Sequence, residues 1–274
     1  MTYPAERSVR CATSVLSLIV IAALCAPLLT PFDPSAQLDI NALKNTAPSW
    51  SHWLGTDPYS RDIASRALFG ARTSLGVASL ATIIATMIGV VWGAIAAVLR
   101  GRIGPVMMSI VDVLRSVPRL LVFFGALVVM GVFNSVGLSL VLGASAWAGT
   151  SRLVFVLVAE LTARPFVESA RALGATRWRV MRQQIVPHLL GPLSASGILL
   201  FADMLALESG LSFLGVGVRP PTASWGNMVQ DALPYLRSAW WLAAVPCVLL
   251  MTTVLAAATI ADHLTSTPTV PSRT

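Results

Sequence analysis

The residue types that most often carry out chemistry are few in this chain and lie far apart. They comprise three histidines and three cysteines: His52, His188, His263, Cys11, Cys25 and Cys247. No CxxC or Cys/His spacing is present, and neither is a Gly-x-Ser-x-Gly or His-Glu-x-x-His pattern. The absence of these patterns argues against a catalytic triad, a zinc site and a disulfide framework. We therefore predict no catalytic residue, no metal and no cofactor.

An ATP-binding loop is missing as well. A Walker A loop ends in Gly-Lys-Ser/Thr because its lysine must reach the phosphates of the nucleotide. The single lysine of this chain, Lys44, lies in Ala-Leu-Lys-Asn-Thr. We predict that the chain is not an enzyme and that any ATP that drives it binds to another protein.

Ionisable residues inside apolar runs form a second group of candidates. They are Asp112, Arg115, Arg119, Arg152, Asp203 and Glu208. Charges within a membrane are costly and usually face the bundle interior or water. Asp112, Asp203 and Glu208 are therefore candidates for lining a pathway, with structural ion pairs or snorkelling near an interface as the alternatives.

Two pairings of these charges follow from their positions. Asp112 and Arg115 are three residues apart, a spacing that allows a pair along one helix. We also hypothesise that Asp203 pairs with Arg119 or Arg152.

The most basic stretch, residues 160–191, has the pattern of two short helices joined by a turn. Pro165 is compatible with the first turn of a helix. Glu168 follows in that first turn, where a negative charge interacts favourably with the helix dipole. Gly174 is typical of a helix end, and Thr176 can cap a second helix that ends at Pro187. A short helix beside an exposed turn can enter a partner's groove, although an ordinary basic loop explains the same pattern.

Composition determines the elements that must position these residues. Of 274 residues, 55% are hydrophobic and 11% are charged, and the mean hydropathy is +0.76. Soluble globular chains carry about 25% charged residues, so a water-exposed surface is excluded. The net charge of +7 comes without aromatic residues interleaved among the basic ones, which argues against nucleic-acid binding.

The apolar runs predict an all-α fold with six transmembrane helices. The expected spans are about 12–31, 73–99, 106–132, 136–158, 193–215 and 239–261. The first run could be a signal peptide, but it is long and lacks a clear cleavage site, so we favour an uncleaved helix. Polar connections, expected as loops, occupy 33–72 and 216–238.

The basic residues predict the orientation of these spans. Ten of them fall on the side that holds both termini, the 100–105 turn and 160–191, and six fall in the two long loops. Short basic loops stay in the cytoplasm. We therefore predict cytoplasmic residues 1–11 and 263–274, a transmembrane domain over 12–262, and outward-facing segments 33–72 and 216–238.

The 164–190 segment resembles the EAA loop of binding-protein-dependent ABC importer permeases. That pattern is Glu-Ala-Ala, three residues, Gly, nine residues and Ile-x-Leu-Pro. Four positions match, namely Glu168, Ala170, Gly174 and Pro187, whereas Ser169, Gln184 and Val186 replace Ala, Ile and Leu. The resemblance implies an ATPase-coupling site made of Glu168, Ser169, Ala170, Leu173, Gly174, Ala175 and Pro187.

Two further stretches resemble the C-type permeases of dipeptide, oligopeptide and nickel importers. The first covers 54–75 and includes Asp57, Arg61, Asp62 and Arg66, with Ser60 where glycine is usual. The second covers 208–227, from Glu208 to Asn227. The tail departs from the group's ending and keeps only Asp262 and Leu264 of it.

This resemblance implies the working assembly. It consists of a second homologous permease, two ATP-binding subunits and an extracytoplasmic solute-binding protein, with the permeases in the lipid bilayer of a bacterial inner membrane. Di- or oligopeptides are the first expectation for the substrate, and nickel or a nickel chelate is the second. An ion-coupled secondary carrier is the alternative of another class, and it would not need a docking loop.

Overall fold

The computed structural model describes residues 3–99, 102–130 and 134–266. Regular structure in these residues is helical, apart from one antiparallel bridge between Thr56 and Asp62. Five helices there are long and apolar enough to cross a membrane: Glu6–Leu24, Ile63–Val98, Ser135–Thr162, Arg177–Phe213 and Trp241–Thr265. The all-α prediction is confirmed for these ranges, while Arg100 and the tail beyond Ser266 lie outside them.

The chain divides into two compact units, and several helices, chiefly α4 (Ile63–Val98) and α10 (Val186–Phe213), contribute residues to both. The first unit covers residues 1–80, 130–139 and 201–260. It holds α1 (Tyr3–Leu24), α2 (Ala26–Leu29), α3 (Ile40–Leu43), the start of α4, the end of α10, α11 (Trp225–Ala232) and most of α12 (Trp241–Ser266).

The second unit covers residues 81–129, 140–200 and 261–274. It holds the rest of α4, α5 (Ile103–Ser116), α6 (Arg119–Met130), most of α7 (Ser135–Thr162), α8 (Pro165–Ala172), α9 (Arg177–Val180) and the start of α10.

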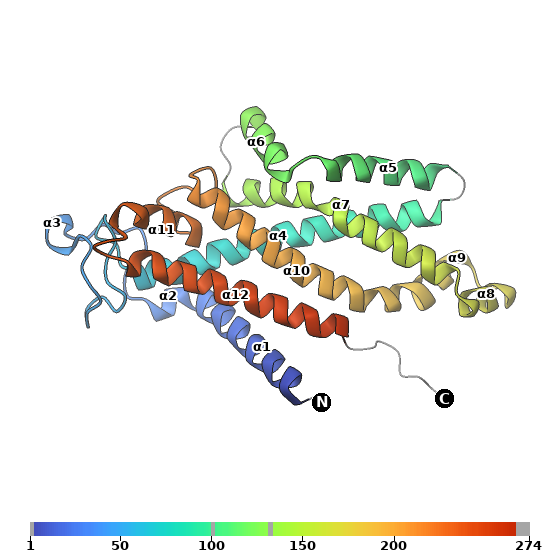
Figure 1. Cartoon of the computed structure of the whole chain (residues 1–274), viewed down its shortest axis with the longest axis horizontal. Helices are drawn as coiled ribbons and strands as arrows, with labels where there is room; N and C mark the ends of the chain where they lie inside the picture. The colour runs from blue at the N-terminus through green and yellow to red at the C-terminus, as the bar shows by residue number, and fades with distance from the viewer. Residues whose placement is uncertain (1–2, 100–101, 131–133, 267–274) are drawn as a thin grey trace. The chain divides into compact units, whose positions relative to one another are not determined.

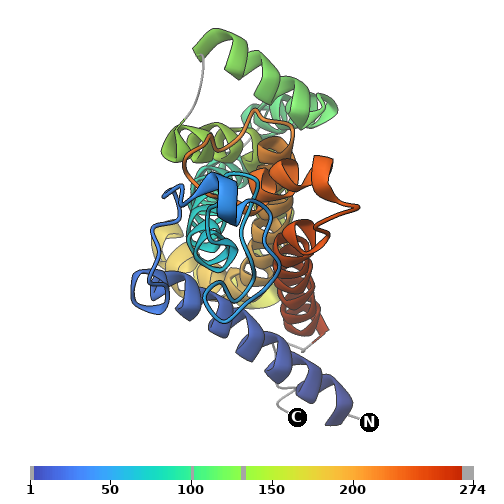
Figure 2. The same cartoon turned by 90° about the vertical axis from the view of Figure 1, so that its left-hand side faces the viewer.

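In the first unit, the segment 30–62 and α11 gather at one end, on the left of Figure 1 and facing the viewer in Figure 2. The predicted loop 33–72 is wrong in its last part, because α4 already begins at Ile63. Asp62 caps this helix: the backbone N–H and the hydroxyl of Ser65 each donate to its carboxylate over 2.8 Å.

The predicted loop 216–238 likewise contains a helix, α11, that the sequence analysis missed. A reciprocal capping box starts it, since the Ser224 hydroxyl accepts from Asn227 N and the Asn227 side chain accepts from Ser224 N. Trp225 is fully buried at the first helical position. A helix of eight residues contains no long apolar run, so the apolar runs of the sequence did not predict it.

In the second unit, α4 and α7 pack closely through small residues. A Cβ added to Gly89 would lie 2.7 Å from Thr150 Cβ and 2.8 Å from Trp147 O, and one on Gly93 would overlap Ser151. Glycines four residues apart let helix backbones approach, which is how helices associate where the surrounding lipid is as apolar as the side chains.

The third predicted span, 106–132, is not one of the five long helices. It is divided into α5 and α6 at Val117 and Pro118, where Val117 has φ −85° and ψ 126°. Proline disfavours helical backbone in the residue before it and supplies no N–H to the preceding turn. The apolar run 106–132 did not predict this break.

Candidate functional site

The 164–190 segment folds largely as predicted. Pro165 lies in the first turn of α8, and Gly174 follows the helix with φ +83°, a conformation that side chains with a Cβ disfavour. The Thr176 hydroxyl accepts from Arg179 N at 3.3 Å and caps α9. The sequence therefore determined both the break and the restart of the helix.

The end of the second helix was predicted wrongly. The chain passes from α9 through a π-helical turn, Met181–Ile185, directly into α10, with Pro187 in the first turn of that long helix. In the π-helical turn, the Val186 N–H donates to Met181 O, five residues back. Proline is tolerated in a first turn because its missing N–H needs no partner there.

A buried apolar cluster anchors the segment to α7. Val167 of α8 and Val180 of α9 are 0% and 2% exposed, and they belong to one cluster with Val154 and Val158 of α7. Phe166 also stacks on His188, with ring centroids 5.5 Å apart. The segment is thus held on the second unit by its buried side.

The other side of α8 is exposed. Leu173 is 89% exposed, and Glu168, Ser169, Gly174 and Pro187 are exposed as well. An open cavity of about 210 Å³ lies beside the turn and is lined in part by Ala170, Leu173 and Ala175. The structure therefore brings six of the seven predicted coupling residues onto one helix and turn, and places Pro187 at the start of α10.

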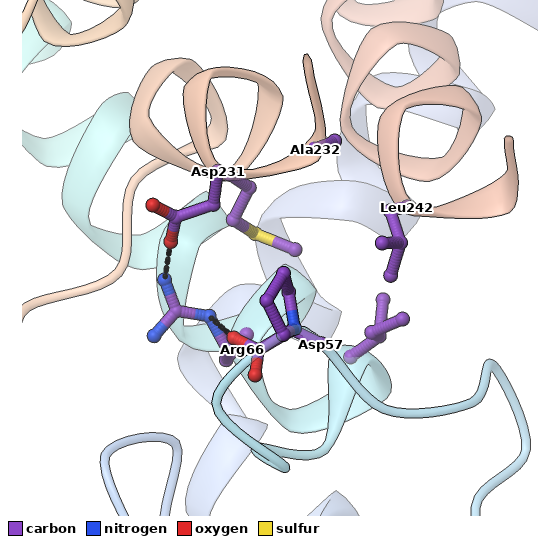
Figure 3. A pocket seen from close by; sticks show the side chains of 8 residues that line it. Asp57, Arg66, Asp231, Ala232 and Leu242 are labelled. Atoms are coloured by element: carbon purple, nitrogen blue, oxygen red, sulfur yellow. Dashed lines mark ion pairs between the residues drawn. The ribbon is translucent and has the colours of Figure 1, made fainter. Parts of the chain in front are cut away.

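A second site of interest is a buried ionic cluster in the first unit. The Arg61 guanidinium donates to Asp57 over 2.6 Å and to Asp231 over 2.8 Å. Arg66, 1% exposed, lies between the same two carboxylates at 3.4 and 3.5 Å (Figure 3). The adjoining cavity measures about 10 Å³, which is too small for a substrate.

Burial governs the electrostatics of this cluster. Burial raises the pKa of the Asp231 carboxyl, and the Arg61 and Arg66 guanidiniums oppose that rise. Desolvation therefore offsets part of the attraction between the charges. The cluster joins the loop before α4 to α11, and it is a structural feature of the fold.

Sequence reasoning noted Asp57, Arg61 and Arg66 as parts of a family pattern, without a role, and missed Asp231. The Asp57–Arg61 spacing was the available signal. Ser60, which stands where glycine is usual, has φ +60°, and its buried hydroxyl has no hydrogen-bond partner in the described residues. This backbone conformation explains the glycine of the family pattern.

Glu208 lies in a different buried network of the first unit. It is 0% exposed, and it accepts from the hydroxyls of Ser212 at 2.8 Å and Ser209 at 3.2 Å. Close by, the Trp225 N–H donates to Ser74 Oγ over 3.2 Å and its indole donates to Ala67 O over 3.0 Å. The two family stretches, 54–75 and 208–227, therefore contact each other.

The other predicted intramembrane charges are exposed, except Arg152, which is half-buried. Asp112 of α5 lies 3.5 Å from Arg152 of α7, with side chains 53% and 41% exposed. In the described residues Asp112 thus pairs with Arg152 and not with Arg115 of its own helix. Asp203 is exposed on α10, and its pairing with Arg119 stays a prediction.

Comparison with known proteins identifies the family. The family described as "Binding-protein-dependent transport system inner membrane component" matches residues 89–266, which include the whole 164–190 segment. The chain belongs to this family. It is accordingly a multi-pass component of a bacterial inner membrane.

Individual relatives of this inner membrane component match most of the chain. The dipeptide transport system permease protein DppC of Bacillus subtilis (strain 168) is 34% identical over 91% of this chain and 78% of its own length. The di/tripeptide permease DppC of Pseudomonas aeruginosa (strain UCBPP-PA14) is 33% identical over 90% and 82%. The oligopeptide permease OppC of Bacillus subtilis (strain 168) is 34% identical over 91% and 81%.

Proposed function

We propose that this chain is the permease subunit of an ATP-driven, binding-protein-dependent importer of di- or oligopeptides. The names of the relatives support peptides, because all three describe peptide transport. Nickel, the alternative substrate, has no such support. An ion-coupled carrier would not need the exposed α8 surface or a binding protein.

One observation carries the coupling role. The segment 164–190 is anchored by Val167 and Val180 on one side and presents Leu173, 89% exposed, on the other. Leu173 is therefore an exposed apolar side chain at the end of an anchored short helix, and such a side chain can insert into a groove of a partner protein. In our proposal the partner is one of two ATP-binding subunits, which hydrolyse the ATP, and the 168–175 surface transmits their closure to the membrane helices.

We also propose six crossings with both termini in the cytoplasm. Besides the five long helices, α5 and α6 together span residues 103–130, longer than the ~20 residues a crossing needs. Their break at Val117 interrupts the helical backbone, and in the last turn of α5 the Ser116 hydroxyl donates to Val113 O. Irregular backbone at membrane depth is tolerated where it faces protein or water.

The half-exposed Asp112–Arg152 pair supports a role in the pathway for the surface of the second unit that α5 and α7 form. Charges at membrane depth rarely face lipid. We propose that α5 and α7 face a path shared with the second permease. Asp203 of the first unit is a separate proposal for a pathway residue. The fully buried Glu208 is instead assigned to holding the first unit together.

The test is uptake of a labelled dipeptide into proteoliposomes that contain the chain with its second permease, its ATPases and its binding protein. Gly174→Pro should abolish uptake and uncouple ATP hydrolysis, because proline cannot adopt the φ of +83°. Gly210→Ala, at an open helical position, is the control. Full transport by Gly174→Pro would rule out the coupling role, and nickel bound to the purified binding protein would rule out peptides.

A further inference from the structure

The second unit contains an open cavity of about 610 Å³ that the proposed function does not use. It lies where the end of α4 and the end of α7 meet the α9 region, and residues from all three line it. Its walls come from helices long enough to cross a membrane and from the basic segment that follows α7. In the proposed orientation of the spans, the cavity lies where the apolar interior of the membrane gives way to its cytoplasmic surface.

The lining of this cavity has two chemical characters. One wall is apolar: Ile95, Val98 and Leu99 are 47%, 41% and 40% exposed, so their side chains are open to a ligand. The other wall carries Arg171 and Arg177, both exposed. Neither guanidinium forms an ion pair within the described ranges 3–99, 102–130 and 134–266, so both are available to an anion.

Trp178 lines the same cavity and is 72% exposed. Tryptophan prefers the boundary between hydrocarbon and water, because its ring is apolar and its indole N–H is polar. Together, an apolar wall, two guanidiniums and a boundary tryptophan match one ligand: a molecule with an alkyl chain joined to an anionic head group.

We propose that this cavity binds an anionic phospholipid. An acyl chain lies against Ile95, Val98 and Leu99, and the phosphate accepts hydrogen bonds from Arg171 and Arg177. Basic pockets between helices on the cytoplasmic side are suited to such head groups. A protein segment is less suited to this cavity. The occupant must carry a negative charge for the two arginines and, at the same place, an apolar part that contacts the hydrocarbon of the membrane.

The lipid has a structural consequence for the coupling segment. Arg171 belongs to α8 and Arg177 to α9, so one phosphate would hold both sides of the Gly174 turn at the membrane surface. This site is separate from the exposed residues Glu168 and Leu173, which are proposed for ATPase docking. Lipid binding and peptide transport can therefore succeed or fail independently in experiments.

The first experiment measures lipid binding to the purified full-length chain by native mass spectrometry, with phosphatidylglycerol and phosphatidylcholine as probes. The wild type should retain phosphatidylglycerol preferentially. The double variant Arg171→Gln/Arg177→Gln should bind it roughly thirtyfold more weakly, since each basic residue near an anionic lipid contributes about 1 kcal/mol and about 1.4 kcal/mol is tenfold in affinity. Arg179→Gln/Arg182→Gln removes the same charge from the same segment outside the cavity and should bind almost normally.

A second measurement does not depend on those variants. Phosphatidylglycerol with a brominated acyl chain should quench the fluorescence of Trp178. The contribution of Trp178 is the part of the quenching that the wild type shows and the Trp178→Phe variant does not. Inorganic phosphate at the same concentration should neither quench nor compete. Equal loss of binding in both double variants, equal affinity for the two lipids, or no quenching of Trp178 would overturn the proposal.

Discussion

The guanidinium of Arg61 lies 2.8 Å from the carboxylate of Asp231, a residue 170 positions further along the chain. The same guanidinium donates to Asp57 over 2.6 Å, so one buried side chain joins two carboxylates from separate segments. Arg66 also contacts both, but at 3.4 and 3.5 Å. Arg61 therefore makes the shorter contacts that attach α11 to the loop before α4.

Replacing Arg61 should weaken the first unit strongly. Arg61→Gln leaves the buried Asp57 and the partly buried Asp231 with Arg66 alone, and breaking a buried pair costs about 3 kcal/mol. Arg61→Lys should lose less stability, because it keeps the charge but cannot bridge two carboxylates with a planar fork. Thermal unfolding in detergent measures both. Arg219→Gln, an exposed residue of the same unit, is the control, and a similar loss there would contradict the assignment.

Glycine at position 60 should stabilise the protein. Ser60 has φ +60° and a buried hydroxyl without a described partner, and left-handed backbone costs a residue with a Cβ about 1 kcal/mol. Ser60→Gly should therefore raise the unfolding temperature. Ser35→Gly, at an exposed position with ordinary φ, should lower it slightly because glycine adds freedom to the unfolded chain. A drop for Ser60→Gly would show that the hydroxyl has a role.

The same substitution at two positions of α4 should have opposite effects. Gly89→Ala places a methyl group 2.7 Å from Thr150 Cβ, and overpacking of this kind costs about 1–3 kcal/mol. Gly76→Ala meets no atom within 4 Å and should gain up to about 1 kcal/mol from helix propensity. Unfolding of the two purified variants compares them directly, and equal stabilities would exclude a close α4–α7 contact.

The exposed and buried sides of α8 should separate transport from stability. Leu173→Ala should sharply reduce peptide uptake and co-purification with the ATPases, while the unfolding temperature stays unchanged because Leu173 is 89% exposed. Val167→Ala, fully buried, should lower stability by roughly 1–3 kcal/mol through the cavity it leaves. Normal uptake by a well-folded Leu173→Ala variant would place the docking surface elsewhere.

Charge reversal tests the Asp112–Arg152 pair. Asp112→Arg or Arg152→Asp alone should reduce uptake, because each places two like charges about 3.5 Å apart. The double reversal should recover much of the activity. The matched control combines Arg152→Asp with Arg115→Gln, which does not restore an opposite charge. Recovery in that control, or none in the double reversal, would exclude the pair.

The predictable part of the candidate site was its local part. Pro165, Gly174 and Thr176 act within a few residues of themselves, through a fixed φ, a positive φ and a side-chain cap, so their effects can be read from the order of residues. The continuation of the helix past Pro187 was missed, because proline ends a helix in its interior but is tolerated in a first turn.

The sequence by itself determined the helical class and the membrane location of this protein. A long apolar helix satisfies its own backbone hydrogen bonds, so its presence depends only on the run of residues that forms it. The tertiary structure decided which charges meet: Asp112 with Arg152, and Arg61 with Asp57 and Asp231. These pairings depend on which helices lie side by side, and neither the composition nor the spacing along one helix contains that information.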